Sequence, residues 1–275
     1  MHGRVVETRW LTPTLVRVVL GGGDLEKIAM VESTDAYVNL AFAPAGAPYD
    51  DVFDPATVRE EQPKEWWPAR RRYTVRSWDA AAGELTIDFV VHGDVGVAGA
   101  WARRARPGDA LVFEGPSGGY RPDPDADWLL MVGDESALPA IAASLESVPP
   151  GTLAVVRLLC DGPDYEVELT CDGNLAVAWV HRLGDGRDGE LLAEAVRDVP
   201  FLRGRVHAFI HGEATEIREI RRHLLVERGL SRQDMSCSPY WRRDMTDEDW
   251  RKVKRDFVAA MDADVAETDP TTEVA

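Results

Sequence analysis

The stretch WLLMVGDESALPAIAASLESV (128–148) begins with an unbroken apolar run and continues, after a tight turn, into a helix-forming segment. A short apolar run without alternation is typical of a strand that is covered on both faces. The turn Gly133-Asp134-Glu135 separates this strand (128–133) from small and apolar residues with helical spacing over 136–148. The stretch therefore predicts one strand–turn–helix unit of a parallel sheet.

The same order of elements recurs toward the C-terminus. In the segment 213–228 Ile217, Ile220 and Leu224 share one face of a predicted helix, and Gly229 follows as its C-cap. We expect further buried strands at TLAVVRLLC (152–160), LAVAWVH (175–181) and AFIHG (208–212), with another helix at GELLAEAVRDV (189–199). Repeated alternation of strand and helix predicts a parallel sheet with helices on both faces.

The N-terminal part has a different pattern, rich in β-branched residues and turns. In ELTIDFVVH (84–92), Leu85, Ile87, Phe89 and Val91 are expected to face inward and Glu84, Thr86 and Asp88 outward. The other predicted elements are two strands within 4–20, strands at 37–42, 72–78 and 110–114, a helix at 98–105, and a long loop at 44–68. Mostly β structure with one short helix predicts a β-barrel.

The two patterns meet in the Pro/Asp-rich segment RPDPDAD (121–127). We therefore predict a β-barrel domain at 1–122 and a Rossmann-like α/β domain at 123–263. A further helix with Thr246 as N-cap is expected near the C-terminus. The acidic tail 264–275 is expected to be disordered.

Composition narrows the classes of function. The 275 residues hold 31 Lys and Arg against 48 Asp and Glu, a formal net charge of −17, which disfavours nucleic acid and anionic membranes as partners. The three cysteines lack CxxC spacing, so neither a disulfide framework nor a zinc site is indicated, and no metal ligands are assigned. No apolar run reaches about 18 residues. We expect a protein of the cytoplasm.

The first candidate site is Arg71-Arg72-Tyr73-Thr74 at the start of a predicted strand. Tyr73 and Thr74 offer an aromatic face and a hydroxyl to a flat heterocycle, and Arg71, two residues before Tyr73, points to the same face and suits a phosphate. An ordinary edge strand with solvated arginines is the alternative.

The second candidate is HGDVGVAGAW (92–101), a glycine-rich turn between a strand and a helix. Backbone N–H groups at a helix N-terminus form a natural anion site, and glycines allow close approach. A plain loop is the alternative interpretation, and His92 is equally consistent with a polar strand cap.

Two further candidates lie in the α/β part. GDESALPAI (133–141) sits where a parallel strand meets its helix, the usual place for a ligand, although Asp134 and Glu135 are also ordinary helix caps. SPYWRR (238–243) joins two aromatics to two cations and suits either a ligand wall or packing between elements.

Taken in order, these segments resemble the siderophore-interacting protein family, a branch of the ferredoxin-reductase-like flavoproteins. The resemblance covers most of residues 4–250. The motifs that carry it are RRYTVRSW, IDFVVHG with the following WA pair, LVFEGPSGGY, GDESALPAI, and HGEATEIREIRRHLLVERGL with YWRR.

The resemblance implies FAD in the barrel, with Arg71 on a phosphate, Tyr73 against the isoalloxazine and Thr74 near its N5. Tyr73 and Thr74 are thus the catalytic candidates. The remaining FAD-binding candidates are Val75, His92, Gly93, Gly96, Ala98, Gly99 and Trp101. It also implies an NAD(P)H domain whose cleft is lined by Asp134, Glu135, Ser136, Ala137, Glu213 and Trp241.

By the same resemblance, electrons pass from NAD(P)H through FAD to a ferric siderophore, which is held by Arg242, Arg243 and Lys64. Ferredoxin is the other possible donor. NADPH would need a cation near its ribose phosphate, and Arg157, Arg182 and Arg187 all stay open for that role.

Several positions depart from the family pattern. A serine expected on the pyrophosphate is absent from Gly96-Val97-Ala98-Gly99, which predicts weaker FAD binding. Ser117 replaces a basic residue and Asp244 a glycine, and both changes reduce the positive charge available to an anionic siderophore. Another acceptor (a free flavin, a quinone or a biosynthetic intermediate) and a non-catalytic binding protein without tight FAD are therefore the alternatives.

Overall fold

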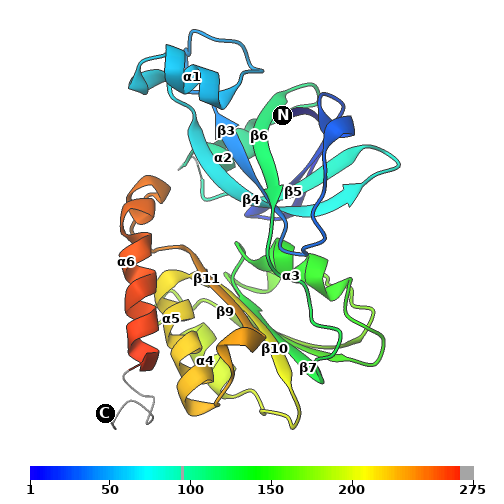
Figure 1. The fold of residues 1–275 in the computed structure, drawn as a ribbon, viewed down its shortest axis with the longest axis vertical. Helices are drawn as coiled ribbons and strands as arrows, with labels where there is room; N and C mark the ends of the chain where they lie inside the picture. Colours follow the sequence, from blue (N-terminus) through cyan, green and yellow to red (C-terminus); the bar gives the residue numbers. More distant parts are fainter. Residues whose placement is uncertain (94–95, 267–275) are drawn as a thin grey trace. The chain divides into compact units, whose positions relative to one another are not determined.

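The computed structural model describes residues 1–93 and 96–266. The chain divides into two compact units, Met1–Arg121 and Pro122–Ala275 (Figure 1). Asp94 and Val95 of the expected glycine-rich turn, and residues 267–275 of the expected tail, lie outside the described residues.

Unit 1 is a closed antiparallel barrel of six strands in the order β1-β2-β5-β4-β3-β6. The strands are β1 (His2–Thr12), β2 (Leu15–Gly21), β3 (Tyr37–Phe42), β4 (Ala69–Asp79), β5 (Glu84–Val90) and β6 (Ala110–Ser117). Val18, Leu40, Ile87 and Phe113 are completely buried inside it. The predicted barrel is confirmed.

The alternation in β5 holds for its apolar face but fails at Asp88. Leu85, Ile87 and Phe89 are fully buried as predicted, whereas Asp88, expected to face solvent, is only 5% exposed. It lies opposite Arg17 on β2, whose Nε and Nη2 donate to the two carboxylate oxygens at 2.7 and 2.8 Å. The alternation in a strand shows on which face a residue lies. It does not show whether a charged partner buries that residue.

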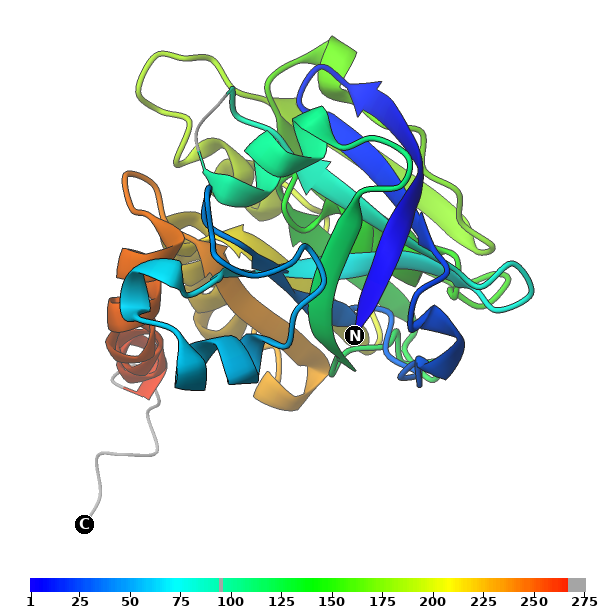
Figure 2. The ribbon, with the colours of Figure 1, turned by 90° about the horizontal axis from the view of Figure 1, so that it is seen from above.

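The predicted loop 44–68 contains helical structure, which corrects the sequence-based expectation. It holds α1 (Pro55–Glu61) and the short 3₁₀ helix η2 (Lys64–Trp66), both outside the barrel strands (Figure 2). Asp54 caps α1 by accepting from the N–H groups of Ala56 and Thr57. The other helices of unit 1 are η1 (Leu25–Lys27) and α2 (Val97–Arg104).

Unit 2 contains a parallel sheet of five strands in the order β11-β10-β7-β8-β9. The strands are β7 (Trp128–Gly133), β8 (Leu153–Cys160), β9 (Asn174–His181), β10 (Val206–Glu213) and β11 (Met235–Trp241). The strand order reverses between β7 and β10, which creates the switch point where such sheets bind ligands. The predicted parallel sheet is confirmed, whereas strand β11 was not predicted.

Helices cover both faces of this sheet, as Figure 1 shows for α3 on one side and α4 and α5 on the other. The bounds are α3 (Leu138–Leu145), η3 (Pro163–Tyr165), α4 (Leu191–Arg197), α5 (Ala214–Arg222), a π-helical turn η4 (His223–Glu227), η5 (Arg232–Asp234) and α6 (Asp247–Ala266). The predicted helix 213–228 thus ends as a π turn, after which Gly229 takes a φ of 69°.

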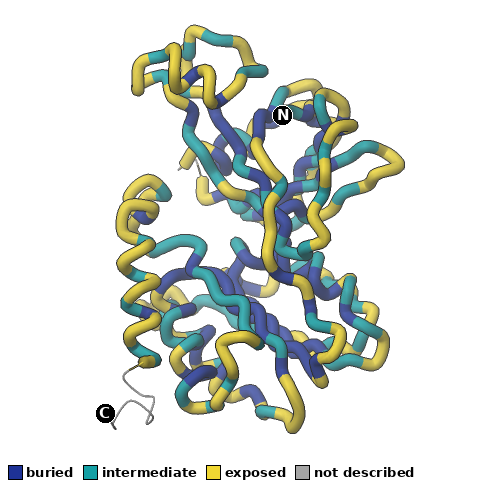
Figure 3. The backbone as a smooth tube through the Cα atoms, in the orientation of Figure 1, coloured by how far each residue is buried: buried dark blue, intermediate teal, exposed yellow. Residues whose placement is uncertain are grey.

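Helix α6 packs beside α5 and is longer than predicted. Thr246 accepts from the N–H of Asp249, which confirms the predicted cap. Arg218 of α5 makes a bidentate ion pair with Asp264, so helical order continues to Ala266 instead of ending at 263. The outer face of α6 is exposed (Figure 3). Within 1–93 and 96–266, none of the helices combines the length and apolarity needed to cross a membrane.

Candidate active site

The barrel brings Tyr73 into an aromatic cluster. Its ring lies 4.5 Å from that of Phe89, centroid to centroid, and Phe89 lies 5.7 Å from Trp101. Thr74 beside it is 9% exposed. Val75 is in the barrel core, and its N–H donates to Ala36 O at 2.7 Å, so its side chain supports the strand from inside.

The arginines that precede Tyr73 have separate environments. Arg71 shares a face of β4 with Tyr73, as the sequence predicted from the strand period, and its Nη1 donates to Arg70 O at 2.9 Å. Arg70 pairs with Glu114, and the Arg72 guanidinium lies 5.6 Å from the ring centroid of Tyr37 on the other face. Arg71 is therefore the arginine placed to act together with Tyr73.

The N-terminus of α2 suits a phosphate. His92 and Gly93 are exposed after β5, and the exposed Gly96 stands at the N-cap with a φ of 83°. Within 1–93 and 96–266, no side chain caps the first turn of this helix. N–H groups at a helix start that lack a side-chain cap are available to an anion. The exposed backbone at the start of α2 therefore fits the FAD pyrophosphate that is predicted for this segment.

The rest of α2 is packed against the barrel. Ala98 and Gly99 are buried, and Trp101 is half-buried against Phe42. A Cβ at Gly99 would lie 2.9 Å from Val90 O, closer than real contacts allow. The missing serine therefore has a packing reason, because the helix approaches β5 too closely to carry a side chain there.

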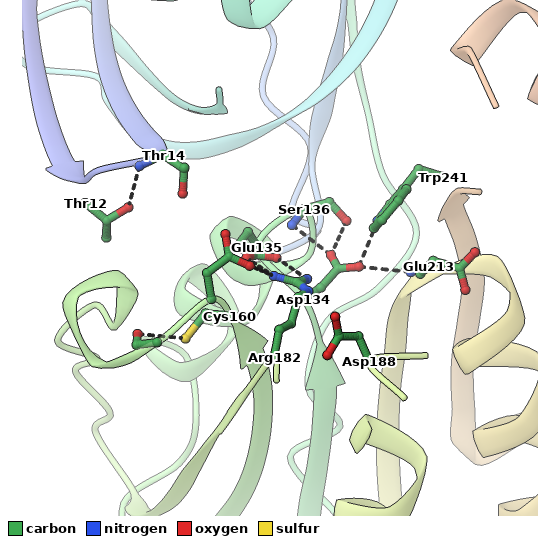
Figure 4. A network of polar contacts seen from close by, with 12 residues as sticks. Thr12, Thr14, Asp134, Glu135, Ser136, Cys160, Arg182, Asp188, Glu213 and Trp241 are labelled. Atoms are coloured by element: carbon green, nitrogen blue, oxygen red, sulfur yellow. Dashed lines mark hydrogen bonds and ion pairs between the residues drawn. The ribbon is translucent and has the colours of Figure 1, made fainter. Parts of the chain in front are cut away.

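In unit 2, Asp134 is the centre of a hydrogen-bond network at the carboxyl edge of the sheet (Figure 4). Its Oδ1 accepts from the backbone N and the hydroxyl of Ser136 at 2.8 and 2.5 Å. Its Oδ2 accepts from the N–H of Glu213 at 2.9 Å and from Trp241 Nε1 at 2.8 Å. Asp134 is 1% exposed, so it joins the ends of β7, β10 and β11 from inside.

Glu213 plays a similar part at the start of α5. Its Oε2 accepts from the N–H groups of Thr215 and Glu216 at 2.7 and 3.1 Å, and its Oε1 accepts from the N–H of Arg243 at 3.1 Å. Of the residues predicted to line the nucleotide cleft, Asp134 and Glu213 thus bond the chain itself, and Ala137 is fully buried. Contact of this group with a nucleotide stays a prediction.

Glu135 belongs to a second network that the sequence did not reveal. Arg182 Nη1 and Nη2 donate to its two carboxylate oxygens at 2.5 and 2.8 Å, and Nη1 also reaches Asp161 Oδ1 at 2.8 Å. Burial raises the pKa of Glu135 despite its partner. Burial alone would lower the pKa of Arg182, but Glu135 and Asp161 outweigh it and raise that pKa. The order β9-β8-β7 brings these three residues together, since each follows or closes one of those strands.

Glu216 is a buried acid that the sequence analysis missed. Its side chain is 1% exposed, Oε1 lies 3.4 Å from Arg243 Nη2, and Oε2 has no hydrogen-bond partner among the described residues. Burial and the nearby Asp134 and Glu213 raise its pKa to about 8. Its position four residues before the buried Ile220 was the available signal, because residues i and i+4 share a helix face.

The three predicted substrate cations are placed differently. The Arg242 guanidinium lies 5.2 Å from the ring centroid of Phe257 on α6, and the Arg243 side chain is 42% exposed beside Glu216. Lys64 is exposed on η2 of unit 1. Arg243 thus contacts the buried acids of unit 2, and contact of Arg242, Arg243 and Lys64 with a substrate stays a prediction.

Solved structures share this fold. The closed six-stranded antiparallel barrel followed by a parallel sheet of five strands is similar to the ferredoxin reductase in carbazole 1,9a-dioxygenase, with a TM-score of 0.59 at 15% identity, which shows a common fold.

The family follows from comparison with known proteins. Residues 4–120 match the siderophore-interacting FAD-binding domain, and residues 126–244 match the siderophore-interacting protein model. The chain belongs to the siderophore-interacting protein family, as its sequence motifs suggested.

Three similar proteins illustrate the relationship. The chain is 32% identical over 257 residues to the ferric vibriobactin reductase ViuB of Vibrio cholerae, covering 90% of this chain and 92% of that protein. It is 32% identical over 235 residues to the NADPH-dependent ferric-chelate reductase of Escherichia coli, covering 82% and 86%. The crystal structure of a siderophore utilization protein from T. fusca has 34% identity and a TM-score of 0.76, covering 90% and 94%.

Proposed function

We propose that this protein is a flavin-dependent oxidoreductase that passes electrons from NAD(P)H through FAD to a ferric siderophore and releases Fe²⁺. The observation that carries the proposal is the start of α2 at Gly96, which no side chain among the described residues caps, in a region that matches an FAD-binding domain. Relatives named as ferric reductases match almost the whole chain, which supports the choice of acceptor.

In this proposal the barrel binds and orients the flavin. The α2 N-terminus and Arg71 hold phosphate oxygens, because both offer N–H donors to negative charge. Tyr73 packs against the ring, held by Phe89 behind it. Thr74 next to it places a hydroxyl near the reactive edge. When bound, FAD supplies the conversion of a two-electron hydride into single electrons.

Unit 2 contributes the reductant in the same proposal. NAD(P)H lies across the carboxyl edge of its sheet, where such sheets bind dinucleotides. Asp134 and Glu213 keep the strand ends in place through buried hydrogen bonds and contact the nucleotide only through the backbone that they position. The similarity to the NADPH-dependent ferric-chelate reductase of E. coli supports a pyridine nucleotide over ferredoxin as the donor.

The acceptor side depends on a few cations. Arg242, Arg243 and Lys64 offer positive charge to an anionic ferric siderophore in a chain with a net charge of −17. Reduction to Fe²⁺ then weakens the hold of the hard oxygen ligands on the metal. A location in the cytoplasm is also part of this proposal. It is supported by the three cysteines, which are free thiols in the structure.

The test is an anaerobic assay of the purified protein loaded with FAD. NADH or NADPH should bleach the flavin absorbance, and a ferric catecholate or hydroxamate should restore it while a ferrous chelator captures Fe²⁺. Reduced flavin that no ferric chelate reoxidises, but that a quinone or free flavin does, would replace the siderophore with that acceptor. Failure to retain any FAD would favour a non-catalytic binding protein.

A further inference from the structure

Asp161 occupies the position where a dinucleotide-binding sheet distinguishes its nucleotide. It directly follows β8, the second strand of unit 2 along the chain and the neighbour of β7 at the switch point. An acid after this strand accepts hydrogen bonds from the adenosine ribose hydroxyls of NAD, whereas an arginine nearby accommodates the 2′-phosphate of NADP. The placement of Asp161 therefore favours an unphosphorylated ribose.

The nearest arginine is already committed. Arg182 donates hydrogen bonds to Glu135 from both terminal nitrogens and to Asp161 from one of them. Arg182 and Glu135 have only 18% and 11% of their side chains exposed, whereas Asp161 has 43%. A phosphate that took Arg182 from Glu135 would leave that buried carboxylate without its partner, which is strongly unfavourable.

The other two arginines that the sequence left open are also engaged. Arg157 Nη1 donates to Val156 O at 2.9 Å, and burial lowers its pKa. Arg187 pairs with Asp185 at 3.1 Å and is more than half exposed, so its charge is already paired with an acid in its own loop. The trio of Asp161, Glu135 and Arg182 carries one net negative charge, which opposes a phosphate dianion.

We propose that the protein selects NADH over NADPH, with Asp161 as the specificity-determining residue and Arg182 as the positioning residue that aims its carboxylate. This inference rests on the proposed function for its nucleotide. By this inference the chain differs in its nucleotide preference from the NADPH-dependent ferric-chelate reductase of E. coli. Removing the charge of Asp161 removes that repulsion, so the ratio of the affinities for NADH and NADPH should fall.

The direct test is calorimetric titration of the FAD-loaded protein with ADP-ribose and with 2′-phospho-ADP-ribose, which needs no turnover. ADP-ribose should bind about ten-fold or more tightly, as expected for one unfavourable charge contact near a surface. Asp161→Asn should bring the two affinities within about three-fold by removing that contact. Asp164→Asn, which removes an equal charge from the exposed η3, should leave the wild-type ratio unchanged.

Three outcomes bear on the inference. Equal or tighter binding of the 2′-phosphorylated ligand by the wild type overturns it, and so does an unchanged ratio in Asp161→Asn. Binding of neither ligand overturns it together with the nucleotide part of the proposed function. Selective binding of ADP-ribose without reduction of the flavin by NADH supports the inference and overturns the proposed function alone.

Discussion

Trp241 Nε1 donates a hydrogen bond to Asp134 Oδ2 at 2.8 Å and joins residues that are 107 positions apart in the chain. The same oxygen accepts from the N–H of Glu213, so one carboxylate connects three parallel strands at their carboxyl ends. The candidate site of unit 2 is therefore built on an internal acid. Glu213 and Trp241 are held in position because Asp134 is buried and accepts hydrogen bonds from both.

Asp134→Asn should destabilise unit 2 strongly. An amide presents a donor to groups that themselves donate, so at least one buried hydrogen bond is lost and one pair of donors is opposed, at a cost of about 2–4 kcal/mol. Trp241→Phe removes a single donor and should cost about 1 kcal/mol. Urea unfolding of each variant beside Asp164→Asn measures the difference. A midpoint for Asp134→Asn equal to that of Asp164→Asn would contradict the central role of Asp134.

Glu216 makes stability depend on pH. Its pKa is about 8 in the folded protein because of burial and the nearby Asp134 and Glu213, against an ordinary 4.5. The folded state therefore binds a proton that the unfolded state has lost, so this contribution to stability is complete below about 4.5 and falls as pH rises toward 8.

Glu216→Gln should flatten that dependence. Between pH 6 and pH 7.5 the free energy of unfolding of the wild type should fall by about 1.4 kcal/mol per pH unit because of this residue. Thermal melts of both proteins at the two pH values provide the comparison. Parallel changes in Tm would show that Glu216 keeps an ordinary pKa.

Gly99→Ser restores the serine of the family pattern but should not improve flavin binding. A Cβ at Gly99 meets Val90 O at 2.9 Å, so α2 must shift away from β5, with a loss of about 1–3 kcal/mol. Val97→Ala at an exposed position of the same helix is the control. Calorimetry with FAD and thermal melts of both variants test this prediction. A stable Gly99→Ser protein that binds FAD more tightly would show that α2 has room for a side chain at this position.

Tyr73→Ala and Tyr73→Phe separate two roles of the same ring. Tyr73→Phe retains the aromatic face, so this variant should keep most of its FAD. Tyr73→Ala should bind FAD about ten-fold or more weakly, as expected for one lost aromatic contact. The flavin-to-protein absorbance ratio after gel filtration is the readout. Equal flavin content in the two variants would remove Tyr73 from the flavin site.

Much of the fold could be predicted, because the local patterns agree with the tertiary environment. The apolar run 128–133 and the alternation of Leu85, Ile87 and Phe89 each specify burial on the correct faces. Strand β11 could not be predicted in this way, since MSCSPYW contains Pro239 and lies at the sheet edge, where a missing N–H is tolerated. Helix α1 was missed because a capping aspartate and a proline are also ordinary loop residues.

The chemistry of the site was harder to predict. Sequence spacing predicts Arg71 on the face of Tyr73, and the unbroken register of β4 opposite β3 is consistent with that period. It could not show that Arg182 pairs with Glu135, since their contact depends on the strand order β9-β8-β7. Asp134 was read as a cap or a ligand contact, whereas its partners at residues 213 and 241 exist only in the folded sheet.

Electron transfer from a pyridine nucleotide to ferric iron can be measured directly. The measurement is the anaerobic stoichiometry of Fe²⁺ captured by a ferrous chelator per nucleotide oxidised, with a ferric siderophore as the acceptor. We expect two ferrous ions per nucleotide, because a hydride carries two electrons and each ferric ion takes one. Oxidation of the nucleotide without Fe²⁺, or no FAD-dependent oxidation at all, would contradict the account.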